Sequence, residues 1–265
     1  MTRHRSLRSR LAGIPARQLL LLLDFDGTLA PIVLRPDRAT LPAPVRAVLH
    51  RLVRLIPVVV VSGRALGDLR RRVNVPGIRY IASHGLAFKE PRSPVRWLGR
   101  RVPRREVLRW VRALRSSAAG IHGALVEDKG WSVALHDRSV HHADRAILRR
   151  RVLRALKPWL TNGQAALVRG KRVLEIRPAG SWNKGTAVAA VLAQPWARNR
   201  IPVYLGDDRT DRDAFRTVRG RGLAVRVGGR RGIWDEDAWL ASPAAVVSVL
   251  TWLTTRREAT PGTLA

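Results

Sequence analysis

Hydrophobic residues near both ends of the chain form short continuous runs that alternate with amphipathic stretches. Residues 19–23 are five leucines in succession, and residues 58–61 are four valines. A strand that is apolar at every position is buried on both faces, which is typical of a parallel sheet covered by helices on each side. The alternation therefore predicts an α/β fold with a doubly wound parallel sheet. The expected strands are residues 19–24, 57–61, 78–83 and 201–205, and the expected helices are residues 43–54, 65–73, 184–193 and 211–218.

The pattern changes between residues 88 and 180. Amphipathic helices alternate there with short strand pairs, an order typical of an α+β domain. The expected elements are helices at residues 101–118 and 140–160, strands at residues 125–128 and 131–136, and a hairpin at residues 167–177.

These patterns divide the chain into three parts. Residues 1–17 are rich in arginine and are expected to form a basic disordered arm. Residues 18–87 and 181–265 form the predicted core, into which residues 88–180 are inserted as an α+β domain. Within the core, residues 254–265 are expected to be a polar tail.

The charge balance is strongly basic, with 50 Lys and Arg against 19 Asp and Glu, a net charge of +31. The arginines are scattered as doublets and triplets along the chain, as on solvated helix faces, and are not gathered in one segment. We therefore expect non-specific attraction to polyanions at low salt and no specific nucleic-acid partner.

Cysteine is absent, which excludes disulfides and zinc–thiolate sites. No apolar stretch approaches the roughly 18 residues of a membrane span, and the leucine run is shorter than the core of a signal peptide. The sequence therefore predicts a cytoplasmic protein with no membrane partner, and we expect a monomer.

Two aspartates, Asp24 and Asp26, end the leucine strand and are followed by the turn residues Gly27 and Thr28. Residues two apart in extended backbone point the same way, so both carboxylates can converge at the strand tip. The carboxyl ends of strands are where open α/β sheets bind ligands. Two like charges held together need a cation or a shared proton. A divalent metal with a phosphoryl group would satisfy both demands.

Three further polar segments fall at predicted strand ends or helix starts. They are residues 62–64 with Ser62, residues 183–185 with Lys184, and residues 206–211 with Asp207. Phosphoryl transfer to a carboxylate needs a nucleophile, a proton donor, a cation, and hydrogen-bond donors around the phosphate oxygens. Asp24 fits the nucleophile and Asp26 the acid/base. Asp24 and Asp207 can supply carboxylates to Mg²⁺, while Ser62, the amides after Asp24 and Lys184 can face the phosphate. Each segment alone could be a capped turn or a solvated helix start; the four together favour chemistry.

These four segments resemble the motifs of the haloacid dehalogenase superfamily of phosphatases. The resemblance implies a Rossmann-like core, an aspartyl-phosphate intermediate and Mg²⁺. It implies a metal site formed by Asp24, the backbone carbonyl of Asp26, Asp207, and Asp211 either through water or as a supporting partner. The residues expected to face the phosphate are Gly27, Thr28, Gly63 and Arg64, with the catalytic set Asp24, Asp26, Ser62 and Lys184.

A narrower resemblance, to the trehalose-6-phosphate phosphatases, covers nearly the whole chain. It rests on segments such as Ser83-His84-Gly85, residues 126–129, residues 136–138 and residues 170–178. The resemblance implies that the inserted domain is a cap that binds the sugar. The candidate substrate-binding residues are His84, Glu127, Lys129, His136, Arg138, Lys171 and Glu175.

Two alternatives remain open for these residues and for the function. Glu127 with Lys129, and Glu175 with Lys171 or Arg177, could be cross-strand ion pairs on a solvated sheet. The resemblance implies hydrolysis of trehalose 6-phosphate to trehalose and phosphate. The same chemistry on sucrose phosphate or a glycosyl-phosphoglycerate, or a catalytically silent basic binding protein, are the competing hypotheses.

Overall fold

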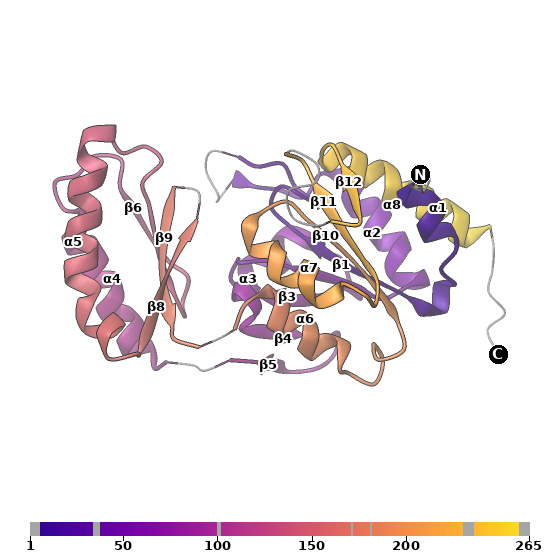
Figure 1. Ribbon diagram of the computed structural model, residues 1–265, viewed down its shortest axis with the longest axis horizontal. Helices are drawn as coiled ribbons and strands as arrows, with labels where there is room; N and C mark the ends of the chain where they lie inside the picture. Colours follow the sequence, from indigo (N-terminus) through magenta and orange to yellow (C-terminus); the bar gives the residue numbers. More distant parts are fainter. Residues whose placement is uncertain are drawn as a thin grey trace. The chain divides into compact units, whose positions relative to one another are not determined.

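The computed structural model describes residues 6–33, 38–99, 102–170, 172–180, 182–229 and 236–259. The chain forms two compact units, Met1–Leu98 with Trp182–Ala265, and Gly99–Ser181 (Figure 1). The first is an α/β unit with a mainly parallel sheet, and the second carries a separate antiparallel sheet. The predicted fold class is confirmed.

The large sheet of the first unit has eight strands in the order β12-β11-β10-β1-β2-β3-β4-β5. Neighbouring strands from β12 to β3 run parallel, whereas β4 and β5 are antiparallel additions at one edge. The strands are β1 (Leu19–Asp24), β2 (Val58–Val61), β3 (Arg79–Ala82), β4 (Ala87–Lys89), β5 (Val95–Trp97), β10 (Ile201–Gly206), β11 (Leu223–Val227) and β12 (Ala238–Leu240). The second unit begins at Gly99, after β5, and not at residue 88 as the sequence pattern indicates, because β4 pairs back onto β3.

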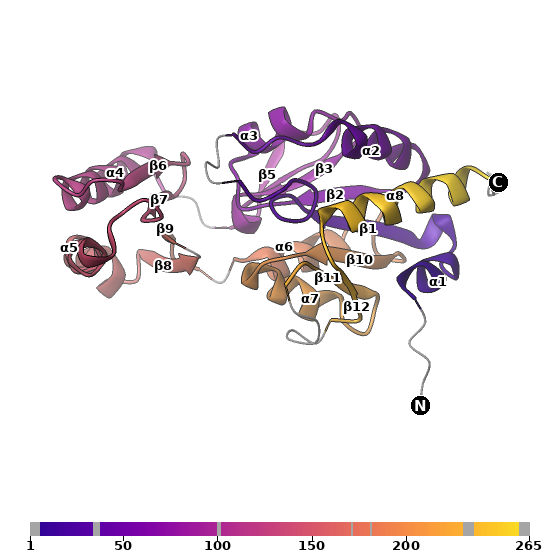
Figure 2. The ribbon, with the colours of Figure 1, turned by 90° about the horizontal axis from the view of Figure 1, so that it is seen from above.

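The leucine run in β1 supplies two hydrophobic cores at once. Leu19, Leu21 and Leu23 face one core, and Leu20 and Leu22 face the other. Helices lie on both sides of the sheet, as Figure 2 shows. On one side are α2 (Ala43–Leu55), α3 (Leu66–Val73) and α8 (Pro243–Glu258), and on the other are α6 (Lys184–Leu192) and α7 (Arg212–Val218). Each fully buried leucine contributes about 1.5–3 kcal/mol of transfer free energy, so β1 is fixed from both faces.

The second unit is a four-stranded antiparallel sheet in the order β6-β7-β9-β8, covered on one face by two helices. Its elements are α4 (Arg104–Ala118), β6 (Leu125–Asp128), β7 (Val133–His136), α5 (His142–Thr161), β8 (Ala165–Gly170) and β9 (Val173–Pro178). Val133, Leu135 and Ile176 pack against the helices. Since side chains alternate along a strand, Glu127, His136 and Glu175 project from the opposite face of this sheet.

The expected disordered arm is wrong for its described part. Residues Leu7–Ala12 form helix α1, which Ser6 caps by accepting a hydrogen bond from the Ser9 backbone N–H. Leu7 and Leu11 are buried in the first core, and Arg8 donates to the Ser248 hydroxyl on α8 at 2.8 Å. The described part of the arm places three apolar side chains, Leu7, Leu11 and Ile14, in the core among its arginines, which is why composition alone conceals it. Residues 1–5 of this prediction lie outside the described residues.

The polar tail expected from residue 254 is wrong for its described part. Helix α8 continues to Glu258, and the Thr254 side chain is buried while its hydroxyl donates to the Leu250 carbonyl at 2.8 Å. Residues 260–265 lie outside the described residues.

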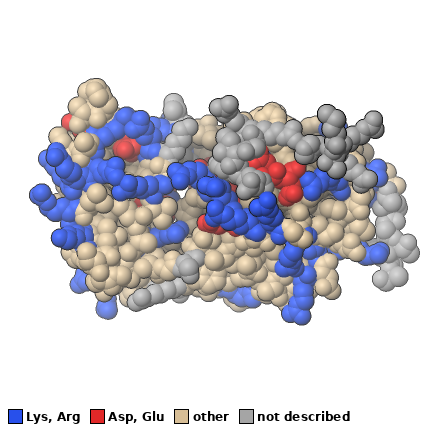
Figure 3. All heavy atoms as spheres, viewed as in Figure 1, with Lys and Arg blue, Asp and Glu red and all other residues tan. Residues whose placement is uncertain are grey.

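Basic side chains are spread over both units on the face shown in Figure 3, with few acidic ones between them. This distribution agrees with arginine doublets on separate helices. Among the described residues, the helices are too short or too polar to cross a membrane.

The docking of α1 gives a first testable prediction. We expect Leu11→Ala to lower the free energy of unfolding by about 2–4 kcal/mol, because the side chain is only 2% exposed. Leu108→Ala is the matched control, since this leucine is 43% exposed and its loss should cost less than about 0.5 kcal/mol. Urea unfolding monitored by circular dichroism measures both. Equal, small effects of the two changes would contradict the docked helix.

Candidate active site

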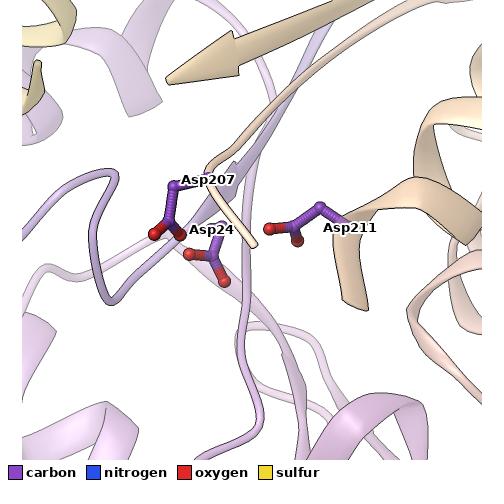
Figure 4. Close-up of side chains that lie close together, drawn as sticks. All are labelled: Asp24, Asp207 and Asp211. Atoms are coloured by element: carbon purple, nitrogen blue, oxygen red, sulfur yellow. The ribbon is translucent and has the colours of Figure 1, made fainter. Parts of the chain in front are cut away.

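The predicted polar residues gather where the parallel strands of the first unit end. Asp24 is the last residue of β1, and Asp207 follows directly after the neighbouring β10. Asp211 ends a short 3₁₀ turn, η4 (Arg209–Asp211), three residues after Asp208. One carboxylate oxygen from each of Asp24, Asp207 and Asp211 lies within 4.8 Å of the others. Figure 4 shows the three side chains turned toward one another.

Gly27 allows this close approach. Its φ is +84°, a backbone conformation that residues other than glycine rarely adopt. Its N–H donates to the Ala30 carbonyl at 2.7 Å. A Cβ at this position would overlap the Asp207 carboxylate. The predicted Gly27 is therefore placed at the site, where it makes room for Asp207. Thr28 is fully buried, and its hydroxyl has no hydrogen-bond partner among the described residues.

Lys184 is the cation of this cluster. It is the first residue of α6, whose start is fixed by a capping box between Asn183 and Thr186. Its side chain is only 4% exposed, and Nζ donates to Asp24 Oδ1 at 2.6 Å and to Asp211 Oδ1 at 2.7 Å. Lys184 is therefore held between two carboxylates and is not a solvated helix residue.

Both carboxylate oxygens of Asp211 accept hydrogen bonds from the protein. Its Oδ1 accepts from Lys184 and from the Tyr204 hydroxyl, each at 2.7 Å, while its Oδ2 accepts from the Asp208 backbone N–H at 2.9 Å. Asp207 differs, because its Oδ1 is buried and has no hydrogen-bond partner among the described residues. Tyr204 was missed by sequence reasoning. The available signal was a tyrosine in a fully apolar strand, where a buried hydroxyl requires a partner.

The carboxylates of the cluster outnumber its one ammonium, so the charges favour binding of a further cation. Burial raises the pKa of Asp24 well above its ordinary value; Lys184 opposes this, while Asp211 and Asp207 add to it. Burial, together with Asp211, raises the pKa of Asp207 to about 7. Three carboxylates with one ammonium leave a formal charge of −2. An all-oxygen donor set with this charge and an unpartnered buried oxygen fits a hard divalent cation.

Two other pKa shifts show how the partners are held. Burial alone would lower the pKa of the Lys184 ammonium, but Asp211 and Asp24 raise it above its ordinary value. Burial and the charge of Asp211 raise the pKa of Tyr204, so its phenol remains a hydrogen-bond donor. Both groups therefore keep their protons at neutral pH.

The predicted segment Ser62–Arg64 follows β2, and the loop with Ser83 and His84 follows the neighbouring strand β3. Ser62 is buried, and its hydroxyl accepts from the Arg64 backbone N–H at 3.1 Å. The Ser83 N–H bonds to the Arg64 carbonyl and the His84 N–H to the Ser62 carbonyl, so the two loops are locked together. A Cβ on Gly63 would overlap the His84 ring, and His84 itself has a positive φ of 53°. The structure therefore brings Ser62, Gly63, Arg64 and His84 together.

Asp26 is paired with Arg64. The guanidinium donates from Nε to Asp26 Oδ2 at 2.7 Å and from Nη2 to Oδ1 at 2.6 Å. Its Nη1 also donates to Asp68 Oδ2 at 3.0 Å. Burial would lower the pKa of Arg64, but Asp26 and Asp68 raise it. Asp26 is therefore hydrogen-bonded to Arg64, a residue that the sequence analysis expected to face the phosphate. Asp68 is a further partner of Arg64 that the sequence did not indicate.

The candidate residues of the second unit form polar pairs on its sheet. Glu175 accepts from Lys129 Nζ at 2.8 Å and from the Ser132 hydroxyl at 2.7 Å. Glu127 lies 2.8 Å from His136 Nε2, and this hydrogen bond lowers the pKa of Glu127. The partners shown differ from those of the ion-pair alternative, because Lys129 pairs with Glu175 and Glu127 hydrogen-bonds to His136. Arg138 is exposed in the turn after β7, and Lys171 lies outside the described residues.

The raised pKa of Asp207 predicts a pH-dependent stability of the metal-free protein. An unfolded carboxyl loses its proton near pH 4, whereas folded Asp207 keeps it to about pH 7. Stability in EDTA should therefore fall as the pH rises through this window, and Asp24 acts in the same direction. Mg²⁺ should restore it by replacing the proton. Thermal unfolding with and without Mg²⁺ at about pH 5 and about pH 8 measures this effect.

Asp207→Asn is the control for this measurement. We expect the variant to lose most of its pH dependence in EDTA and most of its stabilisation by Mg²⁺. Equal Mg²⁺ stabilisation of the variant and the unaltered protein would show that the cation binds elsewhere.

Comparison with known proteins gives the family. The model of the trehalose-phosphatase family matches residues 22–231. "Probable trehalose-phosphate phosphatase D" of Arabidopsis thaliana is 34% identical over 218 residues, covering 78% of this chain and 58% of that protein. The trehalose-phosphate phosphatase of Mycobacterium marinum is 37% identical over 222 residues, covering 81% and 55%. The chain thus spans less than two thirds of the length of these relatives.

The solved structures agree in fold. The C-terminal domain of the C. albicans trehalose-6-phosphate phosphatase superposes with a TM-score of 0.80 at 21% identity, over 94% of this chain and 98% of that one. This likeness concerns the fold alone, whereas the family match covers most of the sequence. The chain belongs to the trehalose-phosphatase family.

Proposed function

We propose that the chain is a Mg²⁺-dependent phosphatase that hydrolyses trehalose 6-phosphate to trehalose and phosphate through an aspartyl-phosphate intermediate. The observation that carries the proposal is the buried Lys184, held between Asp24 and Asp211 beside Asp207 at the carboxyl edge of the sheet. A nucleophilic carboxylate, an ammonium and a site for a divalent cation occur together there, in a member of this family.

Asp24 is the proposed nucleophile. Lys184 binds its Oδ1, so the other oxygen attacks the phosphorus while the bond from phosphorus to the sugar oxygen breaks. The departing alkoxide takes a proton from Asp26. Water then attacks the aspartyl-phosphate, giving its proton to Asp26, and release of phosphate regenerates the Asp24 carboxylate. Ser62, the buried Thr28 hydroxyl and Lys184 supply donors and charge to the phosphate oxygens.

The pair between Asp26 and Arg64 constrains the proton transfer. Both carboxylate oxygens of Asp26 accept hydrogen bonds from the guanidinium. A group that protonates the leaving alkoxide needs one of these oxygens free. The ion pair must therefore open, at least in part, when the substrate arrives, and the Nε–H and Nη2–H that bind Asp26 then turn to a phosphate oxygen.

Mg²⁺ is the proposed cation. Asp24, Asp207 and the backbone carbonyl of Asp26 would hold it, and Asp211 would support the site through Lys184 or a water, since its own oxygens already have donors. When bound, the ion neutralises charge on the phosphoryl oxygens and on the attacking carboxylate.

The second unit, residues Gly99–Ser181, is proposed to be the cap that recognises the sugar. A disaccharide has no charge apart from its phosphate, so recognition requires groups that hydrogen-bond to hydroxyls. The pairs Glu127–His136 and Lys129–Glu175 place such groups on one sheet, with donors and acceptors in reach of one another. Arg138, Lys171 and His84 remain predicted contacts with the substrate.

Competing functions differ in measurable ways. A phosphatase of sucrose phosphate or glycosyl-phosphoglycerate would share the core and prefer its own substrate. A silent basic binding protein would release no phosphate and would bind polyanions in a salt-sensitive manner. The names of the relatives favour trehalose 6-phosphate. The cytoplasmic location, the monomeric state and the lack of membrane and specific nucleic-acid partners remain predictions.

Asp24→Asn tests the chemistry. We expect phosphate release to fall by at least about 10³-fold, because the amide cannot form the covalent intermediate. Asp213→Asn makes the same chemical change at a 40% exposed carboxylate on α7 and should leave the rate unchanged. Phosphate release with purified protein and Mg²⁺ measures both. Substantial turnover in folded Asp24→Asn would rule out this mechanism.

The substrate assignment is tested with a panel of sugar phosphates. Trehalose 6-phosphate should give the highest kcat/KM. Glu175→Gln should lower that value by about 10–100-fold, the effect of losing a hydrogen bond to a charged group. Hydrolysis of p-nitrophenyl phosphate, which has no sugar, should change little in the same variant. A panel led by another sugar phosphate would overturn the substrate while leaving the phosphatase chemistry in place.

A further inference from the structure

Tyr204 is a buried polar residue that the proposed reaction does not use. It lies in β10, is fully buried, and packs edge-to-face on Phe215 of α7 with ring centroids 5.7 Å apart. The core to which it belongs is formed by aliphatic side chains together with Phe88 and Phe215. Its hydroxyl leaves this apolar cluster to donate to Asp211 Oδ1 at 2.7 Å.

The hydrogen bond from Tyr204 completes a chain of contacts that ends at the nucleophile. Asp211 Oδ1 accepts from both Tyr204 and Lys184, and Lys184 Nζ continues to Asp24 Oδ1 at 2.6 Å. The Asp208 backbone N–H fixes the other oxygen of Asp211. The Asp211 carboxylate is therefore anchored at both oxygens before it meets the ammonium.

Lys184 needs such an anchor. A lysine side chain has four carbons and several rotatable bonds, so its ammonium has no fixed direction of its own. Asp24 and Asp207 lie beside Asp211 in the same cluster, so the ammonium has more than one carboxylate to turn toward. An Asp211 carboxylate held at both oxygens gives the ammonium one fixed partner and so determines where Nζ meets Asp24 Oδ1.

We propose that Tyr204 is a positioning residue, whose hydroxyl fixes Asp211 and through it the Lys184 ammonium against the nucleophile Asp24. The proposal rests on the assignment of Asp24 and Lys184 to phosphoryl transfer. Misplacement of a catalytic group by about 1 Å can cost about 100-fold in rate, so a residue outside the reacting atoms can matter this much.

A purely structural role makes a different prediction. If the hydroxyl of Tyr204 only satisfies a hydrogen bond in the core, Tyr204→Phe lowers the melting temperature and leaves kcat of the folded protein unchanged. If it positions Lys184, kcat falls while KM changes little, because the substrate is still bound by its other contacts.

The chain offers a matched control. It contains two tyrosines, and the second, Tyr80 on β3, is only 6% exposed. Tyr80→Phe removes the same hydroxyl from the same sheet. We expect Tyr204→Phe to lower kcat by about 10–100-fold, the range for partners that orient site ligands. Tyr80→Phe should retain the kcat and KM of the unaltered protein. Both variants are assayed with trehalose 6-phosphate and with p-nitrophenyl phosphate.

A double-mutant cycle tests whether the effect passes through Asp211. In an Asp211→Asn background, Tyr204→Phe should cause little further loss, because the contact it supports is already altered. Wild-type kcat in folded Tyr204→Phe would overturn the proposal, as would a full, additive loss in the Asp211→Asn background.

The two substrates keep this test separate from the proposed function. If the unaltered protein hydrolyses only p-nitrophenyl phosphate, the sugar assignment fails and the comparison of tyrosine variants proceeds on that substrate. If it hydrolyses neither, crystal structures decide. A displaced Lys184 Nζ in Tyr204→Phe supports the positioning role, and an unmoved Nζ overturns it.

Discussion

The contact between the buried Lys184 ammonium and two carboxylates is the interaction on which the rest of the site depends. Removing one partner from a buried charged pair costs about 3–5 kcal/mol, because the remaining charge is left without compensation in a medium of low polarity. Lys184 therefore cannot be considered apart from Asp24 and Asp211. Its charge offsets only part of theirs, and the remaining negative charge, with the unpartnered oxygen of Asp207, defines the place for a divalent cation.

The sheet brings these charges together because its strands are fixed from both sides. β1 is buried on both faces between β10 and β2, so Asp24 cannot shift without moving two hydrophobic cores. Gly27 then permits the Asp207 carboxylate to approach the turn after β1 more closely than any side chain would allow. Rigid burial below the site thus supplies the positional precision that the proposed phosphoryl transfer requires.

The site is acidic, whereas the chain as a whole is strongly basic. The chain carries a net charge of +31, yet Asp24 and Asp211 of its acidic cluster are buried at the sheet edge, and Asp207 is partly buried. A positive exterior raises the local concentration of an anionic substrate such as a phosphate ester. The second unit holds its polar groups in pairs, Glu127 with His136 and Lys129 with Glu175, so that each remains satisfied without a ligand. Arg64 does the same for Asp26.

Periodicity predicts the parallel strands, the position of the motif residues at their ends and the α+β character of the insertion, because continuous apolar runs and amphipathic repeats report burial directly. It fails for α1, where two leucines stand among arginines, and for β4 and β5, whose place depends on antiparallel pairing to β3.

Taken by itself, the sequence determined most of the charged residues that gather at the sheet edge, but not Tyr204 or Asp68. Only the tertiary structure decided their partners: Lys184 with Asp24, 160 residues away, Arg64 with Asp26, and Tyr204 with Asp211. Such pairings are set by distances in space between charged and polar groups, which the order of residues along the chain does not contain.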